Sequence, residues 1–164
     1  FHESKEYTTS LLSDSIKETR RISHELMPTV LAEFGLNAAI KEVCDQLTSD
    51  VRFDCKVILD GVKFDNYVEL AIFRTVQELM LNVIKHADAT KAKVKVLAAN
   101  DVVLISVKDN GKGIGTEVKE KPGIGLASIR NKADLLKGTV EITSSSNNGT
   151  LVEVKLPLKF AQYE

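Results

Sequence analysis

Two runs of alternating apolar and polar residues, on either side of Asn100-Asp101, constrain the fold of this 164-residue chain more than any other feature. In the first run, every second residue is small or branched and apolar: Ala92, Val94, Val96 and Ala98. The second run has the same period at Val103, Ile105 and Val107. A period of two places one set of side chains on a single face of a strand, and Asn-Asp between two such runs favours a tight hairpin. We therefore expect an antiparallel pair of strands with one face against a core.

Further periodic segments surround this hairpin along the chain. Apolar residues recur every three or four positions in three expected helices, at about residues 36–49, 66–87 and 125–137. They recur every second position in three further expected strands, at residues 52–59, 139–144 and 150–156. Asn147-Asn148-Gly149 favours a turn between the last two strands. This order predicts a mixed sheet of about five strands with helices on one face, which is an α+β arrangement.

The first part of the chain has a different character. Residues 3–27 contain neither Gly nor Pro, and Pro28 ends the run. A narrow seam recurs at spacings of four and three residues: Leu12, Ile16, Thr19, Ser23 and Leu26. Such a seam is typical of a helix that packs against other helices, and because it is half polar it should need partners from outside the chain. Since the sequence starts at Phe1 in what reads as mid-helix, we expect an excised fragment.

Charge and cysteine content argue against several classes of protein. The chain has 22 basic and 23 acidic residues, mixed along its length, which gives no reason to expect nucleic acid or an anionic membrane as a partner. No apolar run approaches the roughly 20 residues that span a bilayer. Cys44 and Cys55 have neither CxxC nor metal-ligand spacing. We expect them to be reduced core thiols of a cytosolic protein instead of a disulfide.

The expected helix at residues 66–87 carries a set of chemically useful side chains. Glu78, Asn82, Lys85 and His86 share one stripe of this helix, next to an apolar stripe that should face the sheet. An amide oxygen suits Mg²⁺, an ammonium group suits phosphate, and a carboxylate could orient a group or accept a proton. The stripe could therefore hold a metal–phosphate group at the edge of the core. An ordinary amphipathic helix with solvated charges explains the same pattern.

Glycines gather immediately after the predicted hairpin. Five of the nine glycines lie within residues 111–125, where they would allow positive φ angles and close backbone approach to a ligand. Asp109 ends a strand, and its carboxylate could accept a hydrogen bond from the amino group of adenine. Gly123 and Gly125 open a helix, whose free N–H groups could bind phosphate. Neither GxxxxGK[ST] nor a strand-linked GxGxxG is present. A flexible surface loop is the alternative interpretation.

These segments resemble, in order, the N, G1 and G2 boxes of the GHKL ATPases, which include gyrase, the mismatch-repair protein MutL, a heat-shock chaperone and the histidine kinases. The boxes correspond to Gln77–Ala87, Asp109–Gly113 and Gly123–Leu126, and Gly149-Thr150 follows in the last hairpin. The resemblance implies the Bergerat fold, in which a mixed sheet is backed by three helices and ATP lies under a lid. The pattern Asn82-x-x-Lys85-His86-Ala87 is similar to the histidine kinases in particular.

The resemblance also implies a role for each motif residue. Glu78 would be the catalytic residue that polarises the acceptor histidine, and Asn82 would be the ligand of Mg²⁺. Asp109 would read adenine, and Thr150 would lie near the base. The other ATP-binding residues would contact the nucleotide or frame the lid: Lys85, His86, Gly111, Gly113, Gly123, Gly125 and Leu126. The stretch between Gly113 and Gly123 contains no phenylalanine, so the F box is absent and the lid is short.

Upstream motifs narrow the resemblance to one subfamily. Arg20–Pro28, Leu31 and Phe34–Ile40 resemble the nitrate-sensor-like histidine kinases, whose dimerisation domain is of the HisKA_3 type. On this resemblance, residues 1–30 would be the second helix of a truncated dimerisation domain, and residues 31–160 the catalytic ATP-binding domain. The implied partners are a second copy, through the dimerisation helices, and a response-regulator receiver domain. The chain would be the cytoplasmic portion of a protein that could be anchored in the inner membrane through upstream segments.

The implied reaction is transfer of the ATP γ-phosphate to a histidine of the dimerisation domain, for relay to a response-regulator aspartate. The resemblance assigns His86 to the ATP site, and His2 lies outside any motif. His24 lies in a segment similar to the H box of the other large kinase class, but only 58 positions separate it from Asn82. That interval leaves no room for a second hairpin helix. We therefore expect the acceptor to lie upstream and this fragment not to phosphorylate itself.

Two other functions share features with this prediction. A GHKL serine kinase of the anti-sigma-factor class has the same ATP boxes. A non-catalytic nucleotide-binding or dimer-forming module would have the same fold. The helical segment 3–27 and the Leu26–Leu36 motif favour the histidine kinase, and the joint presence of Glu78, Asn82 and Asp109 argues against a degenerate module.

Overall fold

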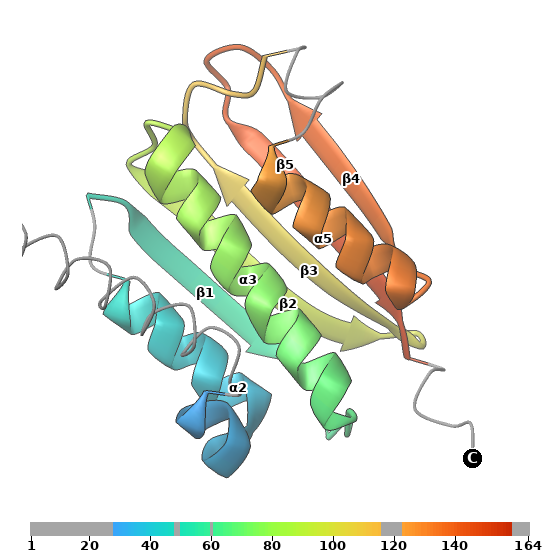
Figure 1. The fold of residues 1–164 in the computed structure, drawn as a ribbon. Coiled ribbons are helices and arrows are strands. Elements are labelled where there is room, and N and C mark those ends of the chain that lie inside the picture. Colours follow the sequence, from blue (N-terminus) through green and yellow to red (C-terminus); the bar gives the residue numbers. More distant parts are fainter. Residues whose placement is uncertain (1–27, 48–49, 60, 116–122, 159–164) are drawn as a thin grey trace, which may run out of the picture.

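The computed structural model describes residues 28–47, 50–59, 61–115 and 123–158. The described chain forms three α-helices and five β-strands that alternate as expected for an α+β domain (Figure 1). In chain order they are α2 (Thr29–Gln46), β1 (Arg52–Ile58), α3 (Asn66–His86), β2 (Lys91–Ala99), β3 (Val102–Asp109), α5 (Ile124–Leu135), β4 (Thr139–Ser144) and β5 (Thr150–Pro157).

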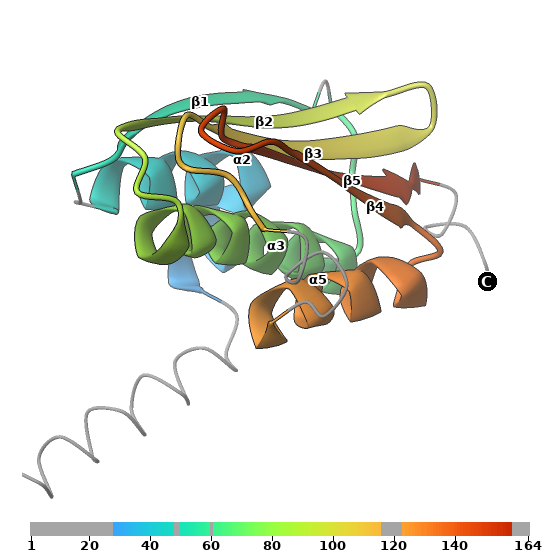
Figure 2. The same cartoon turned by 90° about the horizontal axis from the view of Figure 1, so that it is seen from above.

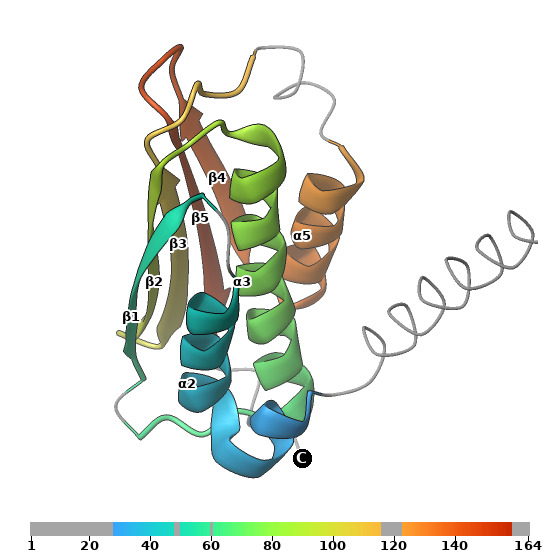
Figure 3. The ribbon, with the colours of Figure 1, turned by 90° about the vertical axis from the view of Figure 1, so that its left-hand side faces the viewer.

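The five strands form one mixed sheet in the order β1-β2-β3-β5-β4. Strand β1 is an edge strand that pairs in parallel with β2, and the other pairings are antiparallel. All three helices lie on one face of the sheet, with α3 between α2 and α5 (Figures 2 and 3). The predicted fold class, a mixed five-stranded sheet backed by three helices, is confirmed.

The core lies between the sheet and the helices. The apolar stripe of α3 supplies Ile72, Val76 and Leu79, each at most 2% exposed. The sheet supplies the inward residues that the alternation predicted, and among these Val94, Val96 and Ile105 are fully buried. The hairpin between β2 and β3 turns at Asn100 and Asp101, both with positive φ, as a tight hairpin of this kind requires. The core therefore fixes the register of the strands and, with it, the face of α3 that remains beside the core.

Helix α2 begins earlier than the sequence predicted. It starts at Thr29 directly after Pro28, and Gly35, at φ 82°, interrupts its helical geometry. The expected helix at 36–49 is therefore the second part of a broken helix that ends at Gln46. Glycine adopts this positive φ without the steric penalty that a Cβ would bring. Leu31 before the break and Ile40 after it are both buried, so the break turns both parts toward the core.

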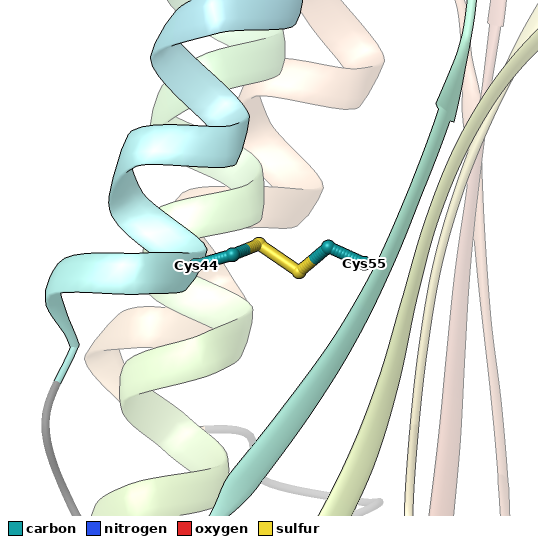
Figure 4. The surroundings of a disulfide bond; sticks show 2 residues. All are labelled: Cys44 and Cys55. Atoms are coloured by element: carbon teal, nitrogen blue, oxygen red, sulfur yellow. A yellow bond between two sulfur atoms is a disulfide. The ribbon is translucent and has the colours of Figure 1, made fainter.

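The expectation that Cys44 and Cys55 are reduced thiols is wrong in this structure. The two side chains form a disulfide that joins α2 to β1, with Cα atoms 6.5 Å apart (Figure 4). Cys55 occupies an inward position of β1, between Phe53 and Val57, and Cys44 lies in the last turns of α2. The packing of α2 on β1 brings together two cysteines whose spacing resembles no known motif.

Other predictions concern the chain before Pro28. The expected helix at 3–27, its seam, and the alternative acceptors His2 and His24 lie outside the described residues. Within the part of the chain that the structure describes, no helix combines the length and apolar character needed to cross a membrane.

Candidate functional site

A cavity of about 970 Å³ opens between α3, the end of β3, the beginning of α5 and the beginning of β5. It collects almost all of the residues that the three motifs predicted. The motif residues that line it are Glu78, Asn82, Lys85, His86, Asp109, Gly113, Gly123, Gly125, Leu126 and Thr150. Apolar side chains line it as well, and these are Leu79, Val83, Ala87, Val107, Ile114, Ile124 and Val152. The cavity thus has an apolar lining with a small number of polar groups, as ligand sites commonly do.

The polar stripe of α3 divides into two pairs. Glu78 and Asn82 are half-buried beside the apolar stripe, as the helical spacing predicted. Lys85 and His86, in the last turn, are exposed at the rim of the cavity. The expectation that the whole stripe lies at the edge of the core therefore holds for the first pair and not for the second. Exposed side chains at a rim can move toward a ligand, while half-buried side chains are held in place.

The beginning of α5 packs closely against this stripe. A Cβ built on Gly125 would meet Oε1 of Glu78, and it would lie 3.3 Å from Oδ1 of Asn82. Helix α5 has Gly123 as its N-cap, and the first turn of any helix leaves N–H groups without intrahelical acceptors. The absence of a side chain at Gly125 thus lets these N–H groups approach a carboxylate and an amide on α3.

Asp109 is buried, with 6% of its surface exposed, at the end of β3. One of its carboxylate oxygens, Oδ1, accepts hydrogen bonds from the backbone N–H of Gly111 at 2.8 Å and of Thr150 at 3.2 Å. These two bonds fix the orientation of the carboxylate. Because a carboxylate has two oxygens, Oδ2 can accept a hydrogen bond from a donor in the cavity.

Gly111 differs from the other motif glycines because it does not line the cavity. A Cβ at this position would collide with the backbone carbonyl of Ala87 at the end of α3. The adjacent Lys112 N–H donates to that carbonyl at 2.8 Å, and the Gly111 carbonyl accepts from Gly149 N–H at 2.9 Å. Gly111 therefore acts through close backbone packing, which ties the glycine loop to α3 and to the last hairpin.

Asn82 has a polar atom without a partner. Its Nδ2 is buried and has no hydrogen bond among the described residues. An unsatisfied buried amide group destabilises a folded chain by about 1–3 kcal/mol. Such groups persist where a ligand or ion completes the set of contacts. Three groups therefore fit a polar, phosphate-bearing ligand in the cavity. They are this amide, the N–H groups of α5 near Gly125, and Oδ2 of Asp109.

Sequence reasoning missed two residues near the site. Ser144, at the end of β4, accepts a hydrogen bond from Ile114 N–H at 2.7 Å and lies 3.0 Å from the hydroxyl of Thr150. Asn110 holds the beginning of β2 by accepting from the N–H groups of Thr90 and Lys91. Neither residue type is unusual in a strand end or a loop. Their roles depend on contacts between segments that are distant in the sequence, and no local sequence pattern predicts such contacts.

Comparison with known proteins supports the motifs. The family described as histidine kinase-, DNA gyrase B- and HSP90-like ATPases matches residues 67–160, more than half of the chain. The signal transduction histidine-protein kinase/phosphatase DegS of Brevibacillus brevis is 31% identical over 150 residues, which cover 90% of this chain and 39% of DegS. The oxygen sensor histidine kinase NreB of Staphylococcus carnosus is 30% identical over 152 residues, which cover 90% of this chain and 44% of NreB. The chain thus spans about two fifths of the length of these relatives.

Solved structures share the fold. The blue-light activated histidine kinase of Erythrobacter litoralis EL346 has a TM-score of 0.62 at 20% identity, over 76% of this chain and 41% of that one. The histidine kinase AdeS of Acinetobacter baumannii has a TM-score of 0.59 at 22% identity, over 92% of this chain and 80% of that one. With the cavity, the buried carboxylate and the ordered motifs, these matches show that the chain belongs to the histidine kinase-, gyrase B- and HSP90-like ATPase family and is homologous to the catalytic domains of sensor histidine kinases.

Proposed function

We propose that this chain binds Mg-ATP in the α3–α5 cavity and transfers the γ-phosphate to a histidine on a dimerisation domain. The observation that carries this proposal is the arrangement of Asp109 and Glu78 at separate places in one cavity. Asp109 offers a fixed, buried acceptor at the strand end. Glu78 lies beside the N-terminus of α5, where phosphate groups would be favoured. A base at the first group and phosphates near the second would place the nucleotide across the cavity.

Each residue then has a task that its surroundings support. Oδ2 of Asp109 accepts from the adenine amino group. The first-turn N–H groups of α5 donate to phosphate oxygens, while Lys85 and His86 supply positive charge or donors from the rim. Glu78 accepts a proton from, or orients, the imidazole of an incoming acceptor histidine. The apolar lining excludes water from the base.

Asn82 is the residue we propose for metal binding. Its side chain is half-buried next to Glu78. Oδ1 is the atom of the amide that could bind Mg²⁺, while Nδ2, which lacks a protein partner among the described residues, could donate to a phosphate oxygen. Within the described part of the chain, no group of three or more His, Cys, Asp or Glu side chains could hold a metal ion. The protein would therefore supply few of the metal's ligands, as is usual for Mg²⁺ that is bound together with a nucleotide. When bound, Mg²⁺ neutralises charge on the phosphate oxygens.

The proposal also covers the domain organisation, the oligomeric state, the partner and the location of the full-length protein. We infer a division at about residue 30, between a dimerisation helix and the catalytic domain. We also infer a homodimer through the dimerisation helices, with a response-regulator receiver domain as the final phosphate acceptor. The cytoplasmic portion of a protein with a membrane anchor elsewhere would fit the resemblance to sensor kinases. The named activities of DegS and NreB support this setting, because the chain aligns with both over 90% of its length.

Calorimetric titration with ATP, with and without Mg²⁺, tests the first half of the proposal. The second half requires a longer chain that includes the complete dimerisation hairpin, incubated with γ-labelled ATP. Acid-labile label on that chain would support histidine transfer. Acid-stable label would instead support the serine kinase of the anti-sigma-factor class, because phosphoserine survives acid and phosphohistidine does not. Nucleotide binding without any transfer would support the non-catalytic module.

A further inference from the structure

The face of the sheet opposite the helices carries a separated set of charges. All three helices cover one face, so alternate residues of each strand point to the other, which we call the open face (Figures 2 and 3). On β1, β2 and β3, Asp54 is the single acidic residue at the open-face positions. Six exposed basic residues share these positions and form what we call the basic cluster: Arg52, Lys56, Lys91, Lys93, Lys95 and Lys108.

The register of the strands places like charges of this cluster directly opposite one another. Three cross-strand pairs combine two basic residues, and these are Arg52 with Lys91, Lys56 with Lys95, and Lys93 with Lys108. Like charges in such positions destabilise a sheet. Within the described residues, no member of the basic cluster forms an ion pair. The fold therefore accepts a repulsion that an anionic partner would relieve.

The sequence conceals the basic cluster because strands sort their residues between two faces. Acidic and basic residues are mixed along the chain, whose net charge is −1, and this mixture gave no reason to expect an anionic membrane. In β2, however, each lysine alternates with an apolar residue of the core. Two acidic residues of the open face, Glu141 and Glu153, lie on β4 and β5 instead. Charges that are mixed in the sequence are thus separated in space.

Apolar side chains continue the open face beyond the lysines. Ile58, Leu97 and Leu104 form one row across β1, β2 and β3. Ile58 is exposed and the two leucines are half-buried. A bilayer that contains anionic lipids accommodates both kinds of side chain, because its phosphate groups attract lysines while apolar side chains enter the boundary between headgroups and acyl chains.

Two other anionic partners fit the open face less well. An acidic protein surface would have to order lysine side chains, which lose much rotamer entropy and are depleted from protein interfaces. Mobile lipid headgroups require no such order. Nucleic acids are commonly bound by stacking on aromatic side chains or by a helix or ribbon in a groove. The open-face positions of the five described strands contain no aromatic residue, and the helices lie on the opposite side.

We propose that the basic cluster and the row of Ile58, Leu97 and Leu104 dock the domain on an anionic lipid bilayer. The inference does not depend on the proposed nucleotide site, because none of these residues lines the cavity. Helices α3 and α5, which frame the cavity, lie on the opposite side of the sheet (Figure 3). A docked domain therefore keeps its cavity accessible.

Co-sedimentation of the 164-residue chain with lipid vesicles tests the proposal. We expect binding to vesicles of equal parts phosphatidylglycerol and phosphatidylcholine, and not to vesicles of phosphatidylcholine alone. Raising NaCl from about 0.1 M to about 1 M should weaken the binding, because the screening length falls from about 10 Å to about 3 Å. The double substitution Lys93→Gln with Lys95→Gln should lower the partition coefficient about 30-fold, which corresponds to about 1 kcal/mol for each lysine. Lys56→Gln with Lys108→Gln, on the neighbouring strands, should have a similar effect.

Lys41→Gln with Lys132→Gln is the matched control. It changes the net charge by the same amount on α2 and α5, away from the open face, and should leave the partition coefficient unchanged. Circular dichroism checks that each variant is folded. Equal binding to both kinds of vesicle, or an equal loss in the control and the cluster variants, would overturn the proposal. Tighter binding to duplex DNA than to the anionic vesicles, at the same ionic strength, would assign the basic cluster to nucleic acid instead.

Discussion

In the proposed site, the single buried carboxylate of Asp109 would serve both structure and recognition. Its Oδ1 holds the glycine loop and β5 together through two backbone N–H groups. This arrangement leaves the second oxygen for a ligand, at a place where water is largely excluded. The two tasks fall on different atoms of one side chain, so a substitution can separate them.

The first prediction therefore concerns Asp109→Asn. The asparagine keeps one oxygen for the N–H groups of Gly111 and Thr150, so the fold should survive. Its amide NH₂ would then face the adenine amino group, and two unpaired donors should weaken ATP binding by about 10- to 100-fold. Calorimetric titration with ATP measures the affinity, and circular dichroism checks that the variant is folded. Asp54→Asn, the same change at an exposed position of β1, should leave the affinity unchanged.

A second prediction separates the two half-buried residues of α3. In a longer chain with its dimerisation hairpin, Glu78→Gln should keep most of the ATP affinity and lose histidine phosphorylation, because we propose that Glu78 acts on the acceptor. Asn82→Ala should remove the Mg²⁺-dependent part of the affinity. Titrations with and without Mg²⁺, followed by phosphotransfer assays, measure both effects. Equal loss of nucleotide binding in the two variants would contradict these roles.

The placement of Glu78 and Asn82 in one cavity could be predicted from the sequence for a local reason. Glu78 and Asn82 are one helical turn apart, so periodicity alone predicts that they share a face. Ser144 could not be found in this way. Its importance depends on the register that sets it opposite Thr150 and on a contact with Ile114, thirty positions earlier. Likewise, the exposure of Lys85 and His86 depends on where α3 ends relative to the sheet.

At the scale of elements, the contact between α5 and α3 sets the third prediction. Gly125→Ala places a methyl group against the carboxylate of Glu78, which is the movable end of a side chain. The fold should therefore survive, while phosphotransfer falls as Glu78 is displaced. Gly111→Ala meets a backbone carbonyl, which cannot move aside, and should destabilise the fold by about 1–3 kcal/mol.

Chemical denaturation of both variants measures the difference. Gly123→Ala is the control for stability, since nothing lies within 4 Å of a Cβ at that position. A Gly125→Ala variant as unstable as Gly111→Ala would show that the α3–α5 contact is structural and not a means of placing Glu78.

The disulfide between α2 and β1 leads to the fourth prediction. It closes a loop across a sequence separation of 11 residues, for which the chain-entropy treatment gives a stabilisation of about 3 kcal/mol. A reductant should lower the free energy of unfolding of the wild-type chain by about that amount. The double substitution Cys44→Ser with Cys55→Ser should show the lower stability without reductant and no response to it. Equal sensitivity of both proteins to reductant would mean that the bond contributes nothing.

The sequence predicted which helices and strands exist better than it predicted where they begin and how they pack against one another. The alternation in β1 marks Cys55 as inward, but only the packing of α2 on β1 shows that Cys44 faces it. Cysteine spacing carries no information when the partners come from different elements. The start of α2 at Thr29 was missed for a similar reason, because Gly35 reads as a helix boundary and its φ of 82° is a bend within the helix.

For the whole molecule, we predict that this 164-residue chain binds Mg-ATP and does not phosphorylate itself. Transfer requires an acceptor held close to the γ-phosphate, and we do not expect His24 to be that acceptor. Incubation with γ-labelled ATP should therefore leave the chain unlabelled, and adding the complete dimerisation hairpin should restore some transfer. Stoichiometric acid-labile label that disappears in His24→Gln would overturn this expectation and make the segment around His24 the acceptor motif.

The position of β1 at the edge of the sheet has a consequence for where the folding unit begins. The family match starts at Tyr67, but the edge of β2 is covered by a strand that ends before that point. A chain that started at residue 67 would present the unpaired N–H and C=O groups of β2, next to buried valines, to any other strand. Such an edge is a template for intermolecular β-pairing. Strand β1 has an open edge of its own, but it pairs along the length of β2 and adds Phe53, Cys55 and Val57 to the cover of the core. The shortest stable form of the domain should therefore include it.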